Sequence, residues 1–255
     1  MKKRIYFNTH KDEIINFKIK KKLIDKKYKY IHKNWFYNLF SFITYRLIAT
    51  PICWIYLKLS HIKFRNKKVL KQVKCGYFVY ANHTNQFSDG ISPSFLCFPK
   101  KAHIIVNSDN IFMPILGKIV RMCGALPLPD TLQATKNFMF ALKHILSKNL
   151  PIIIYPEANL WPYFTKIRDF DDKSFRYPVE YNTPVFVFTT IYHKRKFSKK
   201  PKIEIYVDGP ICADQNLSKT EKRAQLRDFV YNTMKKRAEL NTYEYVEYIK
   251  RSTHD

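Results

Sequence analysis

From Tyr77 onward, short apolar runs alternate with stretches that have the 3.6-residue period of an amphipathic helix. Most of the runs are continuous, as in strands that are buried on both faces of a sheet. The predicted strands are 77–81, 102–106, 124–128, 150–155, 185–191 and 202–207. Three helices are predicted with them. The first is 111–123, the second begins at a cap formed by Asp130 or Thr131, and the third begins at the capping box Ser218 to Glu221. Strands that alternate with helices predict an α/β fold, with a mixed, largely parallel sheet flanked by helices.

An earlier stretch, residues 34–57, carries a single charge, Arg46, and is long enough to cross a membrane. Arg46 near the centre of a bilayer would cost roughly 2.5–3.5 kcal/mol, and Pro51 breaks or kinks a helix. The stretch is also rich in Trp and Tyr, which are enriched at membrane interfaces. We therefore interpret residues 34–58 as a bent pair of helices that lies in the membrane interface. The alternatives are a span and a helix pair packed on the domain core.

The net charge of the 255-residue chain is +26, which indicates a polyanionic partner: an anionic membrane surface or nucleic acid. Residues 1–70 contain 18 Lys and Arg against three acidic residues, so the charge is concentrated around the apolar stretch. This position favours the membrane. We expect a basic membrane-associating region at 1–70, an α/β domain at 71–240 and a C-terminal tail at 241–255. The five scattered cysteines indicate neither a metal site nor a disulfide framework, and fit a reducing cytoplasm.

The clearest chemical signal follows the first predicted strand of the α/β domain, where Asn82-His83 precedes Asp89-Gly90. α/β proteins place catalytic groups beyond the carboxyl ends of strands. An imidazole beside a carboxylate is a general base for an alcohol, because the carboxylate fixes the tautomer and stabilises the imidazolium. On one helix Asp89 would be rotated by about 240° from His83, which puts the two side chains on different faces, so they can meet only across a turn. The alternative is two unrelated loop residues.

These residues resemble the Asn-His-x4-Asp motif of the glycerolipid acyltransferase family, which includes the lysophosphatidate acyltransferases, although this chain has five residues between His and Asp. Residues 155–160, Tyr-Pro-Glu-Ala-Asn-Leu, resemble the family's Phe-Pro-Glu-Gly-Thr-Arg, again after an apolar strand. The resemblance spans roughly residues 48–236. It implies a glycerol-3-phosphate acyltransferase-like fold, an acyltransferase domain at 71–240, catalytic roles for His83 and Asp89, and a role for Glu157 in holding the acceptor.

The family's phosphate-binding arginines are absent, since Leu160 and Asp130 stand at their two positions. A buried phosphate needs a cationic partner. We expect the site to have moved to nearby cations, with Arg168 and Lys166 as the phosphate clamp and Arg121 as a further candidate. The alternative for each of these three residues is a solvated surface charge.

The resemblance implies an acyltransferase that moves a fatty acyl group from acyl-CoA or acyl carrier protein to a lysophospholipid hydroxyl, with 1-acylglycerol-3-phosphate as the favoured acceptor. It implies no metal and no cofactor besides this acyl co-substrate. The expected location is the cytoplasmic face of the cell membrane, as a peripheral or monotopic protein. The alternatives are a basic, aromatic-rich nucleic-acid-binding protein and a family member that binds lipid without catalysis, although no known nucleic-acid motif is present.

Overall fold

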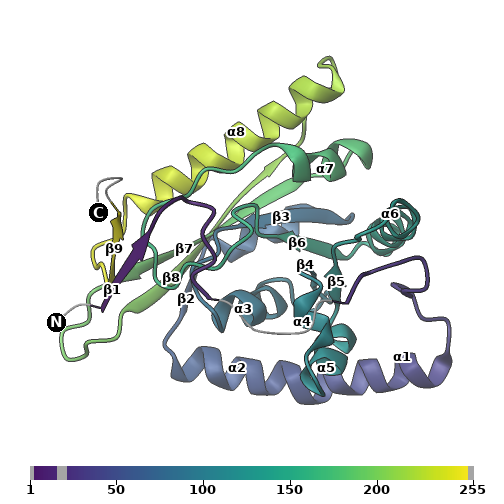
Figure 1. Cartoon of the computed structure of the whole chain (residues 1–255), viewed down its shortest axis with the longest axis horizontal. Helices are drawn as coiled ribbons and strands as arrows, with labels where there is room; N and C mark the ends of the chain where they lie inside the picture. The colour runs from purple at the N-terminus through teal and green to yellow at the C-terminus, as the bar shows by residue number, and fades with distance from the viewer. Residues whose placement is uncertain (1–2, 16–21, 252–255) are drawn as a thin grey trace.

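The computed structural model describes residues 3–15 and 22–251. Their strands form a seven-stranded sheet, in the order β2-β8-β7-β3-β6-β4-β5, and a two-stranded sheet, β1-β9 (Figure 1). The five neighbouring strands β7, β3, β6, β4 and β5 are parallel, and β8 pairs antiparallel with β7. The larger sheet contains β2 (Lys63–Arg65), β3 (Tyr77–Ala81), β4 (His103–Val106), β5 (Ala125–Pro127), β6 (Pro151–Ile154), β7 (Val185–His193) and β8 (Lys202–Ile211). The predicted mixed, largely parallel sheet is confirmed.

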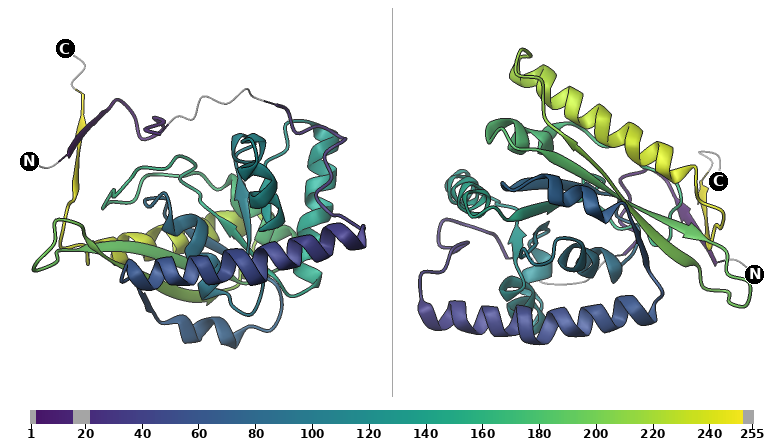
Figure 2. Two further views of the ribbon diagram at one scale, coloured as in Figure 1. Left: turned by 90° about the horizontal axis from the view of Figure 1, so that it is seen from below. Right: turned by 180° about the vertical axis from the view of Figure 1, so that it is seen from behind.

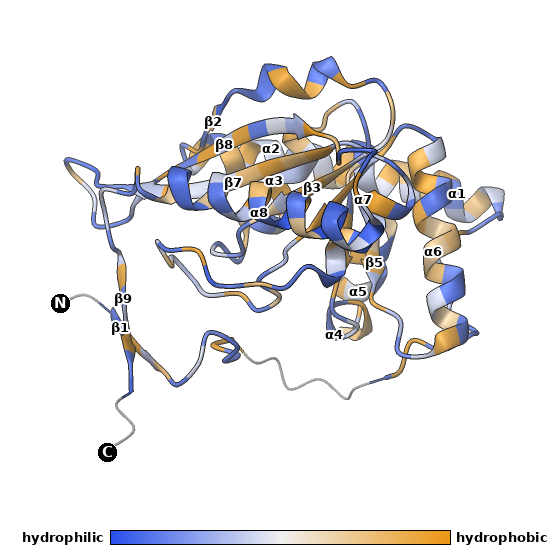
Figure 3. Ribbon diagram, turned by 90° about the horizontal axis from the view of Figure 1, so that it is seen from above, coloured by the Kyte–Doolittle hydropathy of each residue, from blue (hydrophilic) through white to orange (hydrophobic). Residues whose placement is uncertain are grey.

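Helices cover both faces of this sheet (Figures 1 and 2). Phe78 and Tyr80 of β3 pack towards α6, α7 and α8, while Tyr77 and Val79 pack towards α2 and α3. Burial on both faces explains why the run at 77–81 is continuously apolar, and Figure 3 shows hydrophobic residues concentrated in the central strands. The helices of the domain are α3 (Ser88–Leu96), α4 (Asp109–Phe112), α5 (Leu116–Met122), α6 (Leu132–Ser147), α7 (Arg176–Glu180) and α8 (Lys219–Ala238), with 3₁₀ turns η2 (Lys67–Gln72) and η3 (Lys173–Phe175).

Two helix starts agree with their sequence signals, and one predicted helix is divided. The Thr131 side chain caps α6, and Ser218 with Glu221 forms the capping box of α8. The helix predicted at 111–123 is instead α4 and α5, with Pro114 between them. Proline disfavours a helical conformation in the residue before it, and Met113 is accordingly extended (φ −58°, ψ 131°).

The apolar stretch forms one continuous helix of 25 residues, Trp35–Leu59, and the predicted bent pair of helices is wrong. It consists of α1 (Trp35–Phe42), a π-helical segment η1 (Ile43–Ala49) and α2 (Thr50–Leu59). Pro51 lies in the first turn of α2, immediately after the π-helical segment, where the hydrogen-bond ladder is already shifted. The helix therefore accommodates this proline without dividing.

This long helix lies along the domain, and several of its polar residues contact the domain. Arg46 donates to the carbonyl oxygen of Pro99. Ser41 Oγ donates to the carbonyl oxygen of Met122 at 2.8 Å, and Lys101 Nζ donates to the same carbonyl at 2.7 Å. By length and composition the helix also passes for a membrane span, and only 17% of its apolar window is buried. Arg46 thus has a partner on the domain, which explains its presence in an otherwise apolar segment.

The two ends of the chain pair with each other, which the sequence did not indicate. β1 (Lys3–Phe7) and β9 (Val246–Lys250) form the parallel two-stranded sheet. The rings of Phe7 and Tyr248 pack against the fully buried Trp161, with centroids 4.8 and 5.0 Å away. The expected tail at 241–255 therefore contains a paired strand, and the basic region at 1–70 begins with that strand's partner.

Candidate active site

The site is built where β3 ends, between its parallel neighbours β6 and β7. Asn82 follows the last residue of β3 and is 2% exposed. Its side chain donates to the carbonyl oxygen of Thr190 at 3.0 Å, and its Oδ1 accepts from the Thr190 N–H at 2.8 Å. These two hydrogen bonds attach the residue before His83 to β7. They fix the direction in which the chain leaves the sheet.

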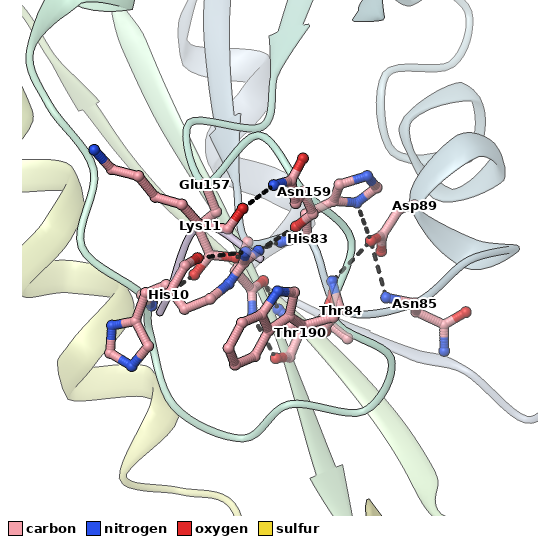
Figure 4. A network of polar contacts seen from close by, with 12 residues as sticks. His10, Lys11, His83, Thr84, Asn85, Asp89, Glu157, Asn159 and Thr190 are labelled. Carbon is pink, nitrogen blue, oxygen red and sulfur yellow. Dashed lines mark hydrogen bonds and ion pairs between the residues drawn. The ribbon is translucent and has the colours of Figure 1, made fainter. Parts of the chain in front are cut away.

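His83 and Asp89 meet across the turn that follows (Figure 4). Nδ1 of His83 lies 2.8 Å from Oδ2 of Asp89. The Asp89 side chain is 5% exposed and the His83 side chain 23% exposed, so the carboxylate is buried and the imidazole reaches the surface. With Nδ1 donating to the carboxylate, the lone pair of the neutral ring is on Nε2. Within residues 3–15 and 22–251, Nε2 has no hydrogen-bond partner, and it is therefore free to accept a proton.

The loop between them accommodates its five residues by wrapping around the carboxylate. Asp89 Oδ2 also accepts hydrogen bonds from the backbone N–H groups of Thr84 and Asn85, at 3.0 and 2.9 Å. The side chain of Asn85 accepts from the Ser88 N–H at 3.0 Å, where α3 begins. Asp89 also lies in the first turn of α3, where the helix dipole favours a negative charge. The predicted contact between His83 and Asp89 is thus present in the structure.

Two tyrosines that the sequence analysis did not single out hold this loop. The Tyr155 ring lies 4.5 Å from the His83 ring between centroids, and its hydroxyl donates to the Asp89 carbonyl oxygen. The Tyr192 hydroxyl donates to the Thr84 carbonyl oxygen at 2.9 Å. Burial raises the pKa of both phenols well above the ordinary value, so they remain donors. Tyr155 is the first residue of the 155–160 motif and Tyr192 directly follows the predicted strand 185–191, so their positions at strand ends are the signal in the sequence.

The family model described as Acyltransferase matches residues 61–190, just over half of the chain. The chain belongs to the glycerolipid acyltransferase family. Among solved structures, its fold is similar to that of the 1-acyl-sn-glycerophosphate (LPA) acyltransferase PlsC from Thermotoga maritima, with a TM-score of 0.56. The two sequences are 16% identical, and the match covers 80% of this chain and 86% of that one. No curated protein matches the chain by sequence.

Glu157 of this acyltransferase supports the backbone of His83 and does not face an open site. Its Oε2 accepts from the His83 N–H at 3.0 Å, and its Oε1 accepts from the Arg168 N–H at 2.9 Å. Oε2 also lies 3.1 Å from Nη2 of Arg168, and the two side chains are 0% and 1% exposed. The expectation that Glu157 holds the acceptor disagrees with this arrangement, because both oxygens are buried and engaged. Glu157 is a positioning residue.

Arg168 is not available for a phosphate, and its predicted place in a phosphate clamp is wrong. Besides Glu157, its guanidinium donates to the carbonyl oxygens of Asn159 and His10 and lies 4.9 Å from the Trp161 ring centroid. Burial lowers the pKa of Arg168 despite the opposing charge of Glu157. The guanidinium is thus an internal cation that links the loop after β6 to the N-terminal segment.

The other two candidate cations lie in different places. Lys166 is exposed on the loop between Glu157 and Arg168, and within the described ranges it forms no ion pair or hydrogen bond. Arg121 lies in the last turn of α5, just before β5 begins. It therefore lies towards the amino-terminal edge of the parallel strands, whereas His83 lies beyond their carboxyl-terminal edge. Of the two, the structure keeps Lys166 available and separates Arg121 from His83.

The acid that replaces a family arginine holds the N-terminal segment in place. Asp130 Oδ2 accepts from the Ile24 N–H at 2.7 Å, and the Asp130 N–H donates to the Ile24 carbonyl oxygen at 3.1 Å. Earlier in the same segment, the Lys11 and Asp12 carbonyl oxygens accept from the side chains of Asn159 and Trp161, at 2.8 and 2.9 Å. The N-terminal segment is thus attached beside β5 and beside the Glu157 loop. Neither attachment was predicted from the sequence.

Proposed function

We propose that this protein transfers a fatty acyl group from a thioester donor, acyl-CoA or acyl carrier protein, to the hydroxyl of a lysophospholipid. The favoured acceptor is 1-acylglycerol-3-phosphate. The observation that carries the proposal is the His83–Asp89 pair, with Nδ1 held by a buried carboxylate and Nε2 open towards the surface. Family membership supports acyl transfer as the chemistry.

In this mechanism His83 acts as the general base and then as the general acid. Nε2 takes the proton of the acceptor hydroxyl while the hydroxyl oxygen attacks the thioester carbonyl carbon. The tetrahedral intermediate then collapses, the carbon–sulfur bond breaks, and the leaving sulfur takes the proton back from Nε2. Asp89 keeps Nδ1 protonated and stabilises the imidazolium between the two steps. The products are an ester and a free thiol, and His83 returns to its starting state.

Phosphate recognition in this proposal rests on exposed cations near the site, since Arg168 is internal. Lys166 lies on the loop that begins at Glu157, and its ammonium has no partner in the described parts of the chain. An exposed lysine binds a phosphate as a point charge without the fixed geometry of a guanidinium. We therefore propose that phosphate recognition is looser here than in a site built on the family's arginines, and that acceptors with other head groups also react.

The proposed location is the surface of an anionic membrane, on its cytoplasmic face. The outward side of the long helix exposes a row of large apolar side chains: Trp35, Phe36, Leu39, Phe40, Phe42, Leu47, Ile48, Ile52, Ile55 and Leu59. A soluble monomer rarely exposes a continuous apolar surface of this kind. Because Ser41 and Arg46 of the helix bind the domain, the proposal is that the helix lies in the interface with its apolar side in the lipid. The site lies beside it, since the Tyr56 and Phe87 rings are 6.2 Å apart.

An acyl-transfer assay tests the proposal. Purified protein is incubated with radiolabelled acyl-CoA or acyl carrier protein thioester and a panel of acceptors, which includes lysophosphatidate, other lysophospholipids and glycerol 3-phosphate. The proposal predicts labelled phospholipid from lysophosphatidate, with weaker product from other lysophospholipids. Absence of transfer to every lysolipid, by protein that binds lipid vesicles, would instead identify a family member without catalysis.

A further inference from the structure

A strongly basic surface lies outside the active site, on the turn between β7 and β8. This basic hairpin, residues 194–201, reads Lys-Arg-Lys-Phe-Ser-Lys-Lys-Pro and contains five cations and no acid. Phe197 at its tip is 91% exposed, the largest exposed fraction among the exposed large hydrophobic side chains of the described residues. The family model ends at residue 190, before the hairpin begins. The hairpin is therefore a feature of this chain beyond the matched family region.

The base of the basic hairpin forms one wall of a hollow of about 400 Å³ in which every lining residue is basic. The lining consists of His61, Lys63, Lys194, Arg195, Lys196 and Lys202. Lys202 is neutralised by Glu204, 2.7 Å away, which also pairs with Arg65. In the described residues Lys63, Lys194 and Lys196 have no carboxylate partner. The side chains that line this hollow thus carry unpaired positive charge, which attracts phosphate groups.

The basic hairpin continues the exposed apolar side of the long helix. Arg195 donates to the carbonyl oxygen of Ser60 at 3.0 Å, which joins the hairpin to the end of α2. Figures 1 and 2 show the hairpin beyond this end of the helix in each view. Leu59, the last residue of α2, is 73% exposed and lies two residues before His61, which lines the hollow. Cations next to exposed apolar side chains match the two layers of a lipid surface, where phosphates lie above the acyl chains.

We propose that the basic hairpin and its hollow bind the phosphate head groups of anionic phospholipids, while Phe197 inserts beside them. The long helix alone is a single apolar line, about which the protein can rotate on a membrane. A head-group site beyond one end of that line, on a different element, fixes the rotation and hence the orientation of the active site. The inference rests on the proposed membrane location but not on the acyl-transfer chemistry.

Vesicle binding tests this proposal without requiring enzymatic activity. The full chain is sedimented with phosphatidylcholine vesicles that either contain or lack phosphatidylglycerol. Lys194→Gln with Lys196→Gln should weaken binding to the anionic vesicles about 30-fold, since each cation near an anionic surface contributes about a five- to sixfold effect. Phe197→Ser should weaken it about tenfold through lost insertion. Binding to pure phosphatidylcholine should change only with Phe197→Ser.

The matched control is Lys235→Gln with Lys236→Gln, on the exposed side of α8. It removes the same charge from the helix that packs on the opposite face of the sheet from α2. The proposal predicts a small effect for this control, and retained binding for Lys194→Arg with Lys196→Arg. Equal losses in the hairpin and α8 variants would overturn the proposal, because they would show a general charge effect. Unchanged vesicle binding with a raised KM for acyl-CoA in the hairpin glutamine variant would also overturn it, and would assign the hollow to the donor's phosphates.

Discussion

Replacement of Arg168 by alanine should destabilise the protein strongly, because it leaves a buried carboxylate without its cation. Glu157 and Arg168 are both fully buried, and the guanidinium also binds two carbonyl oxygens and the Trp161 ring. Removal of one partner from a buried ion pair costs about 3–5 kcal/mol, a large part of the roughly 5–15 kcal/mol that stabilises a typical domain. For a chain of this size the expected fall in Tm is roughly 10 °C.

Thermal unfolding followed by circular dichroism, in one detergent for all variants, measures this effect. The control is Lys166→Ala on the same loop, which removes an exposed lysine and should change the free energy of unfolding by less than about 0.5 kcal/mol. Turnover in Arg168→Ala should fall as well, since Glu157 also holds the His83 N–H. An unchanged Tm for Arg168→Ala, together with a raised KM for phosphorylated acceptors alone, would refute the internal role and restore Arg168 as a phosphate ligand.

Three further predictions concern single residues. Ala158 has a φ of 61° at the family's glycine position, and this left-handed conformation costs a non-glycine residue roughly 1–2 kcal/mol. Ala158→Gly removes this cost but makes the unfolded chain more flexible, so the net result should be a slightly higher Tm. Ala158→Val should lower Tm. Burial lowers the pKa of Lys101 to about 8 from 10.5, so the unfolded chain binds more protons between these values. The stability of the wild type relative to Lys101→Met, measured by denaturant unfolding, should thus rise by roughly 1.4 kcal/mol per pH unit between about pH 8 and pH 10.5 and be constant well below pH 8. Asp89→Asn should reduce kcat by about 10⁴-fold in the acyl-transfer assay with little change in acceptor KM, because the amide favours the wrong tautomer of His83.

Local patterns predicted the individual strands and the His83–Asp89 pair because each depends on residues close in sequence. An apolar run buried on both faces identifies β3, and the sequence separation of six between His83 and Asp89 allows a single turn. The role of Arg168 was not predictable in this way. Its carbonyl partner at His10 lies 158 residues away, and a cation next to an active-site motif has the same sequence signal whether it is buried or exposed.

The predictions for the long helix and for the two ends of the chain were wrong or missing for related reasons. Pro51 predicts a break, but the π-helical segment before it accommodates the proline within one helix. The pairing of β1 with β9 joins the two ends of the chain, and nothing local to either strand specifies its partner. The sequence shows Asp130 where the family has an arginine. Its hydrogen-bond partner, the backbone of Ile24, could not be predicted from the sequence.

Acyl transfer by His83→Ala is the direct test of His83 as the general base. We expect turnover to fall by at least about 10²–10⁴-fold, while Tm and binding to anionic vesicles remain those of the wild type. His83 is partly exposed, and its side chain has Asp89 as its hydrogen-bond partner in the described structure, so the variant should fold. Wild-type turnover by folded His83→Ala protein would contradict the account, because no other described residue presents a carboxylate-held imidazole at the end of β3.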